Sequence, residues 1–328
     1  MRFRHHSAHL VTNALVLASL FAAHAAEPGC ISDEIAAKYA RHLNLEGVGK
    51  ARLKRVIVKR DIEFVRRNDR SLLLDFYSAT NPPKDQACIV VITGGGFNAQ
   101  TKSKFAPYAA YLATRGFATA SISYRGRPNH TYKATIADTK AAVRFLRTHA
   151  AQFGIHPDRF GAMGQSAGGH LAAMLAVSND VAAFEENNAH KNVSSRIQAA
   201  ACFAGVFDFI SRLRDGGHQT NGLQTKRKTN GEWIGVKFSP RNAKWTEASP
   251  IAYVNKNDPP LLLVHCRSDK TVPVAQSEQM YEVIRKTAPQ SRLLIFDEGG
   301  GHGITKASDV NQQAWDATVE FFNQTLRP

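Results

Sequence analysis

The sequence predicts an α/β fold in which helices cover both faces of a mostly parallel β-sheet. Three observations lead to this fold class. Short continuous apolar segments, typical of strands buried on both faces, alternate along the chain with longer amphipathic segments at helical spacing. Such alternation is typical of parallel sheets whose crossover connections are helices. The chain has 328 residues, 43% of them hydrophobic, which is enough for one such domain with a sizeable core.

The first half of the predicted domain begins with two strands around a turn and then alternates between strands and helices. One apolar strand leads into Gly94-Gly95-Gly96, and the helix that follows is closed by Gly116. A long amphipathic helix comes next and is ended by Gly154 and Pro157. We expect strands at Arg55–Phe64, Ser71–Tyr77, Ala87–Thr93 and Ala118–Tyr124, a helix at Phe105–Arg115, and a helix whose apolar face carries Ile136, Val143, Leu146 and Ala150.

The second half continues the alternation to the end of the chain. Its last helix has an apolar stripe at helical spacing, as a helix packed on a sheet requires. We expect strands at Arg159–Met163, Ile197–Phe203, Pro260–Cys266 and Ser291–Phe296, and helices at Ser166–Val177, Val274–Thr287 and Asp309–Leu326.

One segment, residues 211–248, interrupts the alternation. It is polar and rich in Gly, Lys and Arg, yet it contains Trp233 and Trp245. Two interpretations stay open: a lid or substrate wall over the sheet, or a long surface loop. Basic residues outnumber acidic ones in this segment, which favours an acidic polymeric substrate, such as a uronate-bearing polysaccharide, if the segment borders the active site.

The N-terminus has the pattern of a cleaved secretory signal. Arg2 and Arg4 precede an apolar run, Leu10–Ala23, that is too short to span a bilayer easily, and Ala23-His24-Ala25 supplies small residues for cleavage. The residues before Cys30 do not fit a lipoprotein signal, so no stable membrane anchor is expected. We predict a signal peptide at 1–25, an N-terminal segment at 26–54, a catalytic domain at 55–328, and a secreted or periplasmic location.

Composition excludes several classes of function. The formal charge is +15, from 42 Lys and Arg against 27 Asp and Glu, but the basic residues are scattered and form no nucleic-acid motif. We therefore expect a basic surface and no nucleic-acid partner. Cys88, Cys202 and Cys266 lie in or at the end of apolar strands without a C-x-x-C pair, which predicts buried free thiols. No cluster has metal-ligand spacing, so neither a metal nor another cofactor is expected.

The segment Gly164-Gln165-Ser166-Ala167-Gly168 is a G-x-S-x-G motif between a predicted strand and a predicted helix. A nucleophile on a sharp strand-to-helix turn brings its backbone close to the neighbouring chain, so glycine is needed two residues before and two residues after it. The motif alone is a weak signal, but the strand–turn–helix context strengthens it. Ser166 is therefore the candidate nucleophile.

A serine nucleophile needs a base that a carboxylate orients, and in this fold the acid and then the histidine follow the serine along the chain. Asp269 stands just after the strand Pro260–Cys266, and His302 lies in a glycine-rich loop just after Ser291–Phe296. They are the candidate acid and base. The competitors are His170 as a packing or capping residue, His265 as a residue that satisfies a backbone group, His218 in the polar segment, and Asp208 and Asp297 as acids.

The negative charge that develops on a carbonyl oxygen during acyl transfer must meet fixed N–H donors. One is expected at Ala167, where the helix after the nucleophile begins. Others are expected in a glycine-rich loop after an earlier strand, and Gly94-Gly95-Gly96 occupies that place.

On these residues the sequence resembles the α/β-hydrolase superfamily, and within it the carboxylesterases similar to hormone-sensitive lipase and to bacterial feruloyl and acetylxylan esterases. The resemblance extends from about Asp61 to the C-terminus. It is carried by Leu74-Asp75-Phe76-Tyr77, Gly94–Phe97, Tyr124-Arg125, Asp158-Arg159, Gly164–His170, Ala248-Ser249-Pro250, Pro259-Pro260, Asp269 with Val272-Pro273, and Gly301-His302-Gly303.

The resemblance implies an α/β-hydrolase fold with Ser166 as nucleophile, Asp269 as acid and His302 as base. It also implies that the N–H groups of Gly95, Gly96 and Ala167 form the oxyanion hole. The chain departs from the family pattern twice, with Thr93 where the family usually has His and Cys266 where it usually has Gly. We expect the Thr93 hydroxyl to tie the oxyanion loop, and we expect Cys266 to add bulk near the acid.

The predicted function is that of a secreted serine carboxylesterase that works through an acyl-enzyme. The expected substrate is a small-molecule or polysaccharide ester, with acetyl or feruloyl esters on carbohydrate as the favoured type. One alternative is a serine peptidase similar to the prolyl-oligopeptidase group, although the chain has no room for that group's propeller domain. The other is a non-catalytic binding protein built on the same fold.

Overall fold

The structure is a computed structural model that describes residues 28–68, 70–179, 181–186, 190, 192–214, 222–297, 300–303 and 308–327. The predicted signal peptide at 1–25 and His218 lie outside the described residues. Within this part of the chain, no helix is both long enough and apolar enough to cross a membrane.

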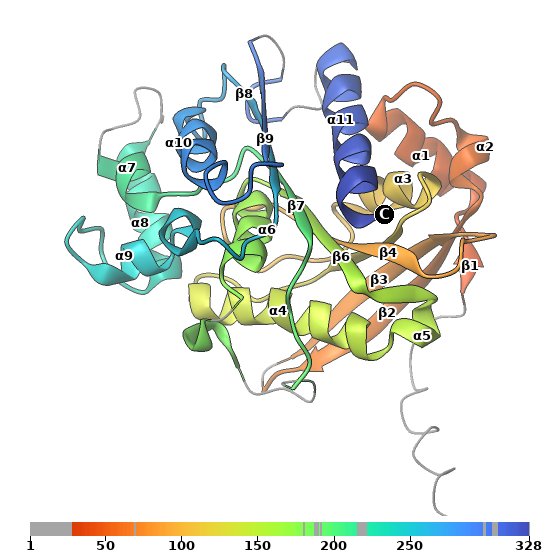
Figure 1. Cartoon of the computed structure of the whole chain (residues 1–328), viewed down its shortest axis with the longest axis horizontal. Helices are drawn as coiled ribbons and strands as arrows, with labels where there is room; N and C mark the ends of the chain where they lie inside the picture. Colours follow the sequence, from red (N-terminus) through yellow and green to blue (C-terminus); the bar gives the residue numbers. More distant parts are fainter. Residues whose placement is uncertain are drawn as a thin grey trace, which may run out of the picture.

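A nine-stranded sheet forms the centre of the molecule (Figure 1), in the order β1-β2-β3-β5-β4-β6-β7-β8-β9. The first pairs, β1 with β2, β2 with β3 and β3 with β5, are antiparallel, and all the other pairs are parallel. This architecture confirms the predicted α/β fold. The strands are β1 (Gly29–Cys30), β2 (Val56–Arg66), β3 (Ser71–Ala79), β4 (Gln86–Ile92), β5 (Ala118–Ile122), β6 (Ile155–Gln165), β7 (Ala199–Phe203), β8 (Leu261–Cys266) and β9 (Arg292–Phe296).

Helices cover both faces of the sheet (Figure 1). One face is covered by α1 (Asp33–Leu43), α2 (Lys50–Leu53), α3 (Ala106–Thr114) and α11 (Ser308–Leu326). The other is covered by α4 (Tyr132–Thr148), α5 (Ala150–Phe153), α6 (Ala167–Val177), α7 (Phe209–Arg214), α8 (Leu223–Ile234), α9 (Ala243–Glu247) and α10 (Ala275–Ile284).

The two faces carry separate hydrophobic cores, because successive residues of a strand point to opposite sides. In β4, which is buried along its whole length, Cys88, Val90 and Ile92 belong to the core under α4 and α6. The alternate residues Ile89 and Val91 belong to the core under α3 and α11. Burial on both faces explains why β4 reads as a continuous apolar run in the sequence.

The segment 211–248 is mainly helical where the structure describes it, and it packs against the core. Trp233 on α8 and Trp245 on α9 are both fully buried. The interpretation as a long surface loop was therefore wrong. The polar composition did not indicate this packing, because it depends on two large aromatic rings, while most of the other described side chains of the segment are at least partly exposed.

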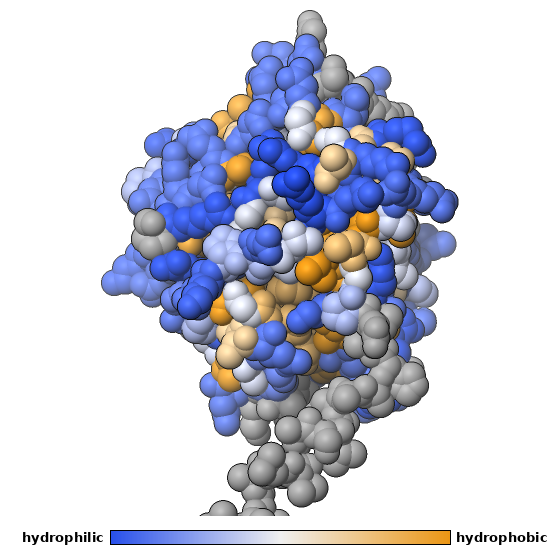
Figure 2. Space-filling view, turned by 90° about the vertical axis from the view of Figure 1, so that its right-hand side faces the viewer, coloured by the Kyte–Doolittle hydropathy of each residue, from blue (hydrophilic) through white to orange (hydrophobic). Residues whose placement is uncertain are grey.

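Residues 26–54 add elements that the sequence did not predict, namely β1, α1 and α2. The side chain of Ser32 caps α1 by accepting a hydrogen bond from the N–H of Ile35, and Leu43 of the same helix is fully buried. All four cysteines are free; Cys30 is exposed, and the other three are buried as predicted. Figure 2 shows the side of the molecule at the right of Figure 1, where hydrophilic residues cover most of the surface.

Candidate active site

Ser166 stands at the sharp turn between β6 and α6, with φ 58° and ψ −122°. A positive φ is unusual for a residue with a side chain and indicates backbone strain at this turn. The flanking glycines are required by space, because a Cβ on Gly164 would lie 2.6 Å from the Ile92 oxygen and one on Gly168 only 2.0 Å from it. The carbonyl end of β4 thus presses directly against the turn that presents Ser166.

Three side chains from separate loops meet at this turn in a single hydrogen-bonded chain. His302 Nε2 lies 2.9 Å from Ser166 Oγ, and His302 Nδ1 lies 2.7 Å from Asp269 Oδ2. The side chain of Gln165 also donates to the carbonyl oxygen of His302 over 2.5 Å, which ties the histidine loop to the serine turn. The three residues can come together because β6, β8 and β9 are parallel, so the loops after them leave the same edge of the sheet.

Asp269 is held by four donors. Its Oδ1 accepts from the N–H groups of Thr271 and Val272 over 2.7 and 3.0 Å, and its Oδ2 accepts from His302 and from His265. Burial by itself would raise the pKa of Asp269, but the hydrogen bonds from His265 and His302 outweigh it, so the pKa lies well below its usual range. The carboxylate is therefore ionised at neutral pH, and its hydrogen bond with His302 is charge-assisted.

His265 has a larger role than the sequence suggested. It does satisfy a backbone group, the carbonyl oxygen of Val272 at 3.0 Å, but the same Nε2 lies 3.2 Å from Asp269 Oδ2. Both partners are acceptors, so Nε2 carries the proton, and Nδ1 faces the Ser277 hydroxyl at 2.7 Å. His265 thus donates to the same carboxylate oxygen as His302. Its position in the sequence, four residues before Asp269, could have indicated that the two side chains lie close together.

Cys266, the second departure from the family pattern, does not displace the acid. Its side chain belongs to the core on the α3 and α11 face and is fully buried. Burial raises the pKa of this thiol, and the charge of Asp269 raises it further. The N–H of Asp269 donates to the Cys266 carbonyl oxygen over 3.1 Å, so the backbone of this residue starts the turn that places the acid.

The oxyanion loop after β4 is fixed by side chains that hold its carbonyl groups. The expectation for Thr93 was wrong, because its buried hydroxyl has no hydrogen-bond partner within the described residues. The oxygens of Thr93, Gly94, Gly95 and Gly96 accept hydrogen bonds from Tyr124 Oη (2.5 Å), Lys104 Nζ (3.2 Å), Asn98 Nδ2 (2.8 Å) and Arg127 Nε (2.9 Å), respectively.

The N–H groups of this loop stay available. Within the described residues, the amide groups of Gly95 and Gly96 donate to no acceptor, and Ala167 begins α6, where a helix has no internal acceptor for its first N–H groups. Gly95, Gly96 and Ala167 all line the same pocket as Ser166 and His302. This arrangement can stabilise negative charge on an oxygen bound beside Ser166.

The competing residues lie elsewhere or have other partners. His170 is fully buried, its Nδ1 lies 2.7 Å from the Val206 oxygen, and burial lowers its pKa to about 3. Asp208 accepts a hydrogen bond from the N–H of Ile210, and Asp297 pairs with Arg267. Among the described residues there is no group of His, Cys, Asp and Glu suited to a metal ion.

The pocket over Ser166 has a volume of about 490 Å³, which is in the usual range for a small-molecule site. Thr225, Lys226, Thr229 and Asn230 of α8 form one wall of it. This observation fits the interpretation of residues 211–248 as a substrate wall.

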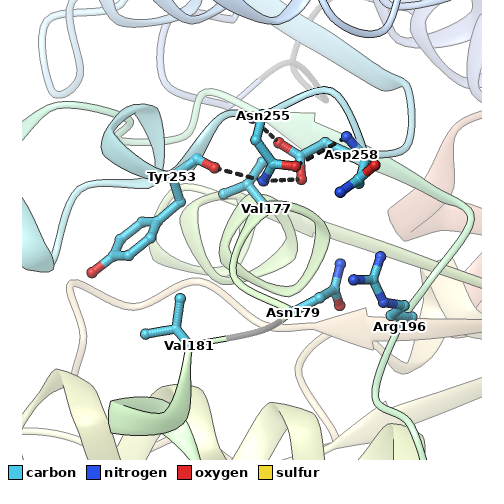
Figure 3. Close-up of a pocket in the computed structure, with 8 residues that line it drawn as sticks. Val177, Asn179, Val181, Arg196, Tyr253, Asn255 and Asp258 are labelled. Carbon is cyan, nitrogen blue, oxygen red and sulfur yellow. Dashed lines mark hydrogen bonds between the residues drawn. The ribbon is translucent and has the colours of Figure 1, made fainter.

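A second pocket, of about 150 Å³, lies at the opposite end of α6 around Val177 (Figure 3). Three of its residues are joined by hydrogen bonds: both the backbone N–H and the side chain of Asn255 donate to Asp258, and the Asn255 side chain also donates to the Tyr253 oxygen. Among the described residues, no serine or histidine lines this second pocket.

The chain is similar to a family model and to proteins that are named as esterases. The family model BD-FAE matches residues 74–284. Esterase LipQ of Mycobacterium tuberculosis is 27% identical over 256 residues, which cover 77% of this chain and 59% of that protein. The chain spans about half the length of the curated relatives it matches.

Two solved structures are similar in fold. One is Thermogutta terrifontis esterase 2 phosphorylated by paraoxon, with a TM-score of 0.65 and 26% identity, covering 83% of this chain and 96% of that one. The other is a bifunctional GH43-CE protein of Bacteroides eggerthii, with a TM-score of 0.71 and 26% identity, covering 82% of this chain and 38% of that one.

Proposed function

The chain belongs to the BD-FAE family of α/β-hydrolases, and on this basis we propose that it is a serine carboxylesterase. The observation that carries the proposal is the hydrogen-bonded triad Ser166–His302–Asp269, with distances of 2.9 and 2.7 Å. The triad lies in one pocket with three backbone N–H groups that have no acceptor in the described part of the chain. All the groups that acyl transfer requires are thus within reach of one substrate carbonyl.

Hydrolysis proceeds in two halves. His302 Nε2 takes the proton of Ser166 Oγ as the oxygen attacks the ester carbonyl, and the N–H groups of Gly95, Gly96 and Ala167 hold the resulting oxyanion. The C–O bond to the alcohol breaks, His302 returns the proton to the leaving alcohol, and the acyl group stays on Ser166. Water then enters, gives its proton to His302, attacks the acyl-enzyme and releases the carboxylic acid, and Ser166 recovers its proton.

We propose esters of carbohydrates, small or polymeric, as the substrate class, with acetyl or feruloyl groups as the acyl part. The size of the pocket and the likeness to the bifunctional GH43-CE protein of Bacteroides eggerthii support this class. We also propose export through the predicted signal at residues 1–25, which can be tested by N-terminal sequencing of the protein recovered from the periplasm and the medium.

The test of the catalytic assignment is covalent labelling. Incubation with paraoxon is expected to abolish hydrolysis of 4-nitrophenyl acetate and to add one diethylphosphoryl group, mapped by mass spectrometry to the peptide that contains Ser166. A Ser166→Ala variant is expected to take no label and to keep its thermal midpoint near that of the parent. Turnover with the label on another residue, or no ester hydrolysis at all, contradicts the proposal. Faster cleavage of aminoacyl amides than of acetyl esters would instead indicate a peptidase.

A further inference from the structure

The pocket over Ser166 is lined by four cationic side chains and, among the described residues, by no Asp or Glu. Two of the four have structural partners. Lys104 donates to the Gly94 oxygen, and Arg127 donates to the Gly96 oxygen and pairs with Glu232 at 2.7 Å. The other two, Arg212 and Lys226, have no carboxylate partner within the described residues.

Arg212 is the less usual of these two, because the residue as a whole is buried, at 4% exposure. One arm, Nη2, donates to the Thr271 oxygen over 3.0 Å, while the buried Nε has no partner. Burial lowers the pKa of Arg212 to about 10, although the nearby charge of Asp269 opposes the change. The group therefore remains charged at neutral pH. A buried cationic donor without a partner is costly in the empty pocket.

Asn230 adds a second unpartnered donor from α8. Its residue exposure is 3%, and its Nδ2 has no hydrogen-bond partner within the described residues. Lys226 lies four residues earlier, on the same face of the helix. Burial lowers the pKa of Lys226, and the positive charges of Arg212 and Arg127 lower it further, so positive potential accumulates on this side of the pocket.

We propose that Arg212, Lys226 and Asn230 form a subsite for a free carboxylate carried by the ester substrate. A carboxylate in this pocket can accept hydrogen bonds from the polar side chains that line it, neutralises the surplus charge and matches the planar guanidinium group. The subsite lies in the same pocket of about 490 Å³ as Ser166, so the carboxylate and the scissile ester belong to one small unit, such as a single sugar acid or a short dicarboxylic half-ester. The inference rests on the proposed esterase function.

The test compares esters that differ in one charge. For a carboxylate on the alcohol side, kcat/KM is measured for 4-acetoxybenzoate and for its neutral counterpart 4-acetoxybenzamide. For a carboxylate on the acyl side, the pair is phenyl hydrogen adipate and phenyl hexanoate. We expect a preference for the anionic member of about tenfold or more in at least one pair, as one charge-assisted hydrogen bond implies.

The variants separate this subsite from general surface charge. Lys226→Gln and Asn230→Leu are each expected to reduce the preference at least about threefold, and Arg212→Met about tenfold or more. The matched control is Lys228→Gln, which removes the same charge from an exposed position on the same helix and is expected to keep the preference. Thermal midpoints check folding, and Lys226→Gln decides the question if Arg212→Met does not fold.

The outcomes distinguish the two proposals. If no ester is hydrolysed, the proposed function fails, and the subsite fails with it as a substrate site. Hydrolysis of neutral esters without an anionic preference in either pair overturns the subsite alone. A preference that survives both Lys226→Gln and Arg212→Met, or that Lys228→Gln removes equally, also overturns it, because the selectivity then comes from elsewhere.

Discussion

The floor and the wall of the pocket are built on opposite principles. The floor consists of Ser166, Asp269, His302 and the oxyanion loop. Its acceptor groups receive hydrogen bonds from within the protein: the Asp269 carboxylate from four donors, and each backbone carbonyl from Thr93 to Gly96 from one side chain. The wall, formed by α7 and α8, presents Arg212 and Asn230 with buried donor atoms that have no partner among the described residues.

This difference indicates where the protein is preorganised and where it depends on its substrate. Reacting groups must be held in position before the transition state forms, so the hydrogen bonds of the floor are made within the protein. Donors that recognise a substrate must stay free until it binds. The five predictions below test this contrast, from the largest expected effect to the smallest.

The largest effect is expected at the centre of the floor. Asp269→Asn is expected to lower kcat about ten-thousand-fold, because an amide no longer fixes the His302 tautomer that accepts a proton from Ser166. Initial rates on 4-nitrophenyl acetate measure the loss. Asp297→Asn is the control, since that carboxylate pairs with Arg267 outside the site. A similar loss in both variants would contradict the assignment of the acid.

The same substitution has a consequence for stability as the pH changes. Folding lowers the pKa of Asp269, so its ionised form stabilises the native state above the unfolded value of about 4, and that contribution is lost as the pH falls through the lower folded value. The difference in unfolding free energy between the parent protein and Asp269→Asn should therefore shrink below about pH 4. Urea titrations at several pH values check this.

The next prediction concerns how firmly the wall is attached to the rest of the domain. Trp233 is fully buried, stacks on Phe97 with ring centroids 4.0 Å apart, and donates to Thr135 Oγ1 over 2.9 Å. Trp233→Ala is expected to cost about 3–5 kcal/mol of unfolding free energy in urea. Lys228→Ala on the same helix should stay within about 0.5 kcal/mol of the parent. A small cost for Trp233→Ala would mean that α8 can detach without unfolding the domain.

A smaller effect is expected at His265, which acts through Asp269 rather than on substrate. His265→Leu removes the donor 3.2 Å from Asp269 Oδ2 and is expected to lower kcat about 10- to 100-fold with little change in KM. His265→Gln can place an amide N–H near the same position and should restore much of kcat. Equal losses in the two variants, or a loss that falls on KM, would contradict a positioning role.

The smallest effect contrasts two hydroxyl groups near the oxyanion loop. Tyr124 donates to the Thr93 oxygen, whereas the hydroxyl of Thr93 itself has no partner in the described structure. Tyr124→Phe should lower kcat about three- to tenfold by loosening the loop, an effect of about 1 kcal/mol. Thr93→Val should leave kcat within about twofold and leave stability unchanged or improved. The reverse order would show that Thr93 ties the loop.

The sequence predicted the sheet and the positions after its strands better than it predicted the contacts between them. The motif around Ser166 and the order of Asp269 and His302 are local signals, each placed by the end of one apolar strand. Their meeting follows from the parallel arrangement of β6, β8 and β9, which alternation in the sequence already implies. The catalytic roles of these residues stay predictions until the labelling experiment is done.

Contacts that join distant segments could not be predicted in this way. Tyr124 and Thr93 are 31 residues apart, and Trp233 reaches Thr135 across 98 residues. The identity of a tyrosine or a tryptophan does not predict its hydrogen-bond partner, because the pairing depends on how α8 and the loop after β5 pack on the sheet. Composition also left a surface loop as one interpretation of residues 211–248, because Lys and Arg are frequent there. The packing is instead decided by the two buried tryptophans.

The position of β9 has a consequence for heat tolerance. It is the last strand of the sheet, it pairs only with β8 among the described strands, and four of its five residues are partly exposed. Edge elements open at lower free energy than the centre of a fold. Since His302 follows this strand, catalysis should stop on warming before the domain melts. Substitutions that stabilise this edge of the sheet should therefore extend activity to higher temperature more than substitutions in its buried interior.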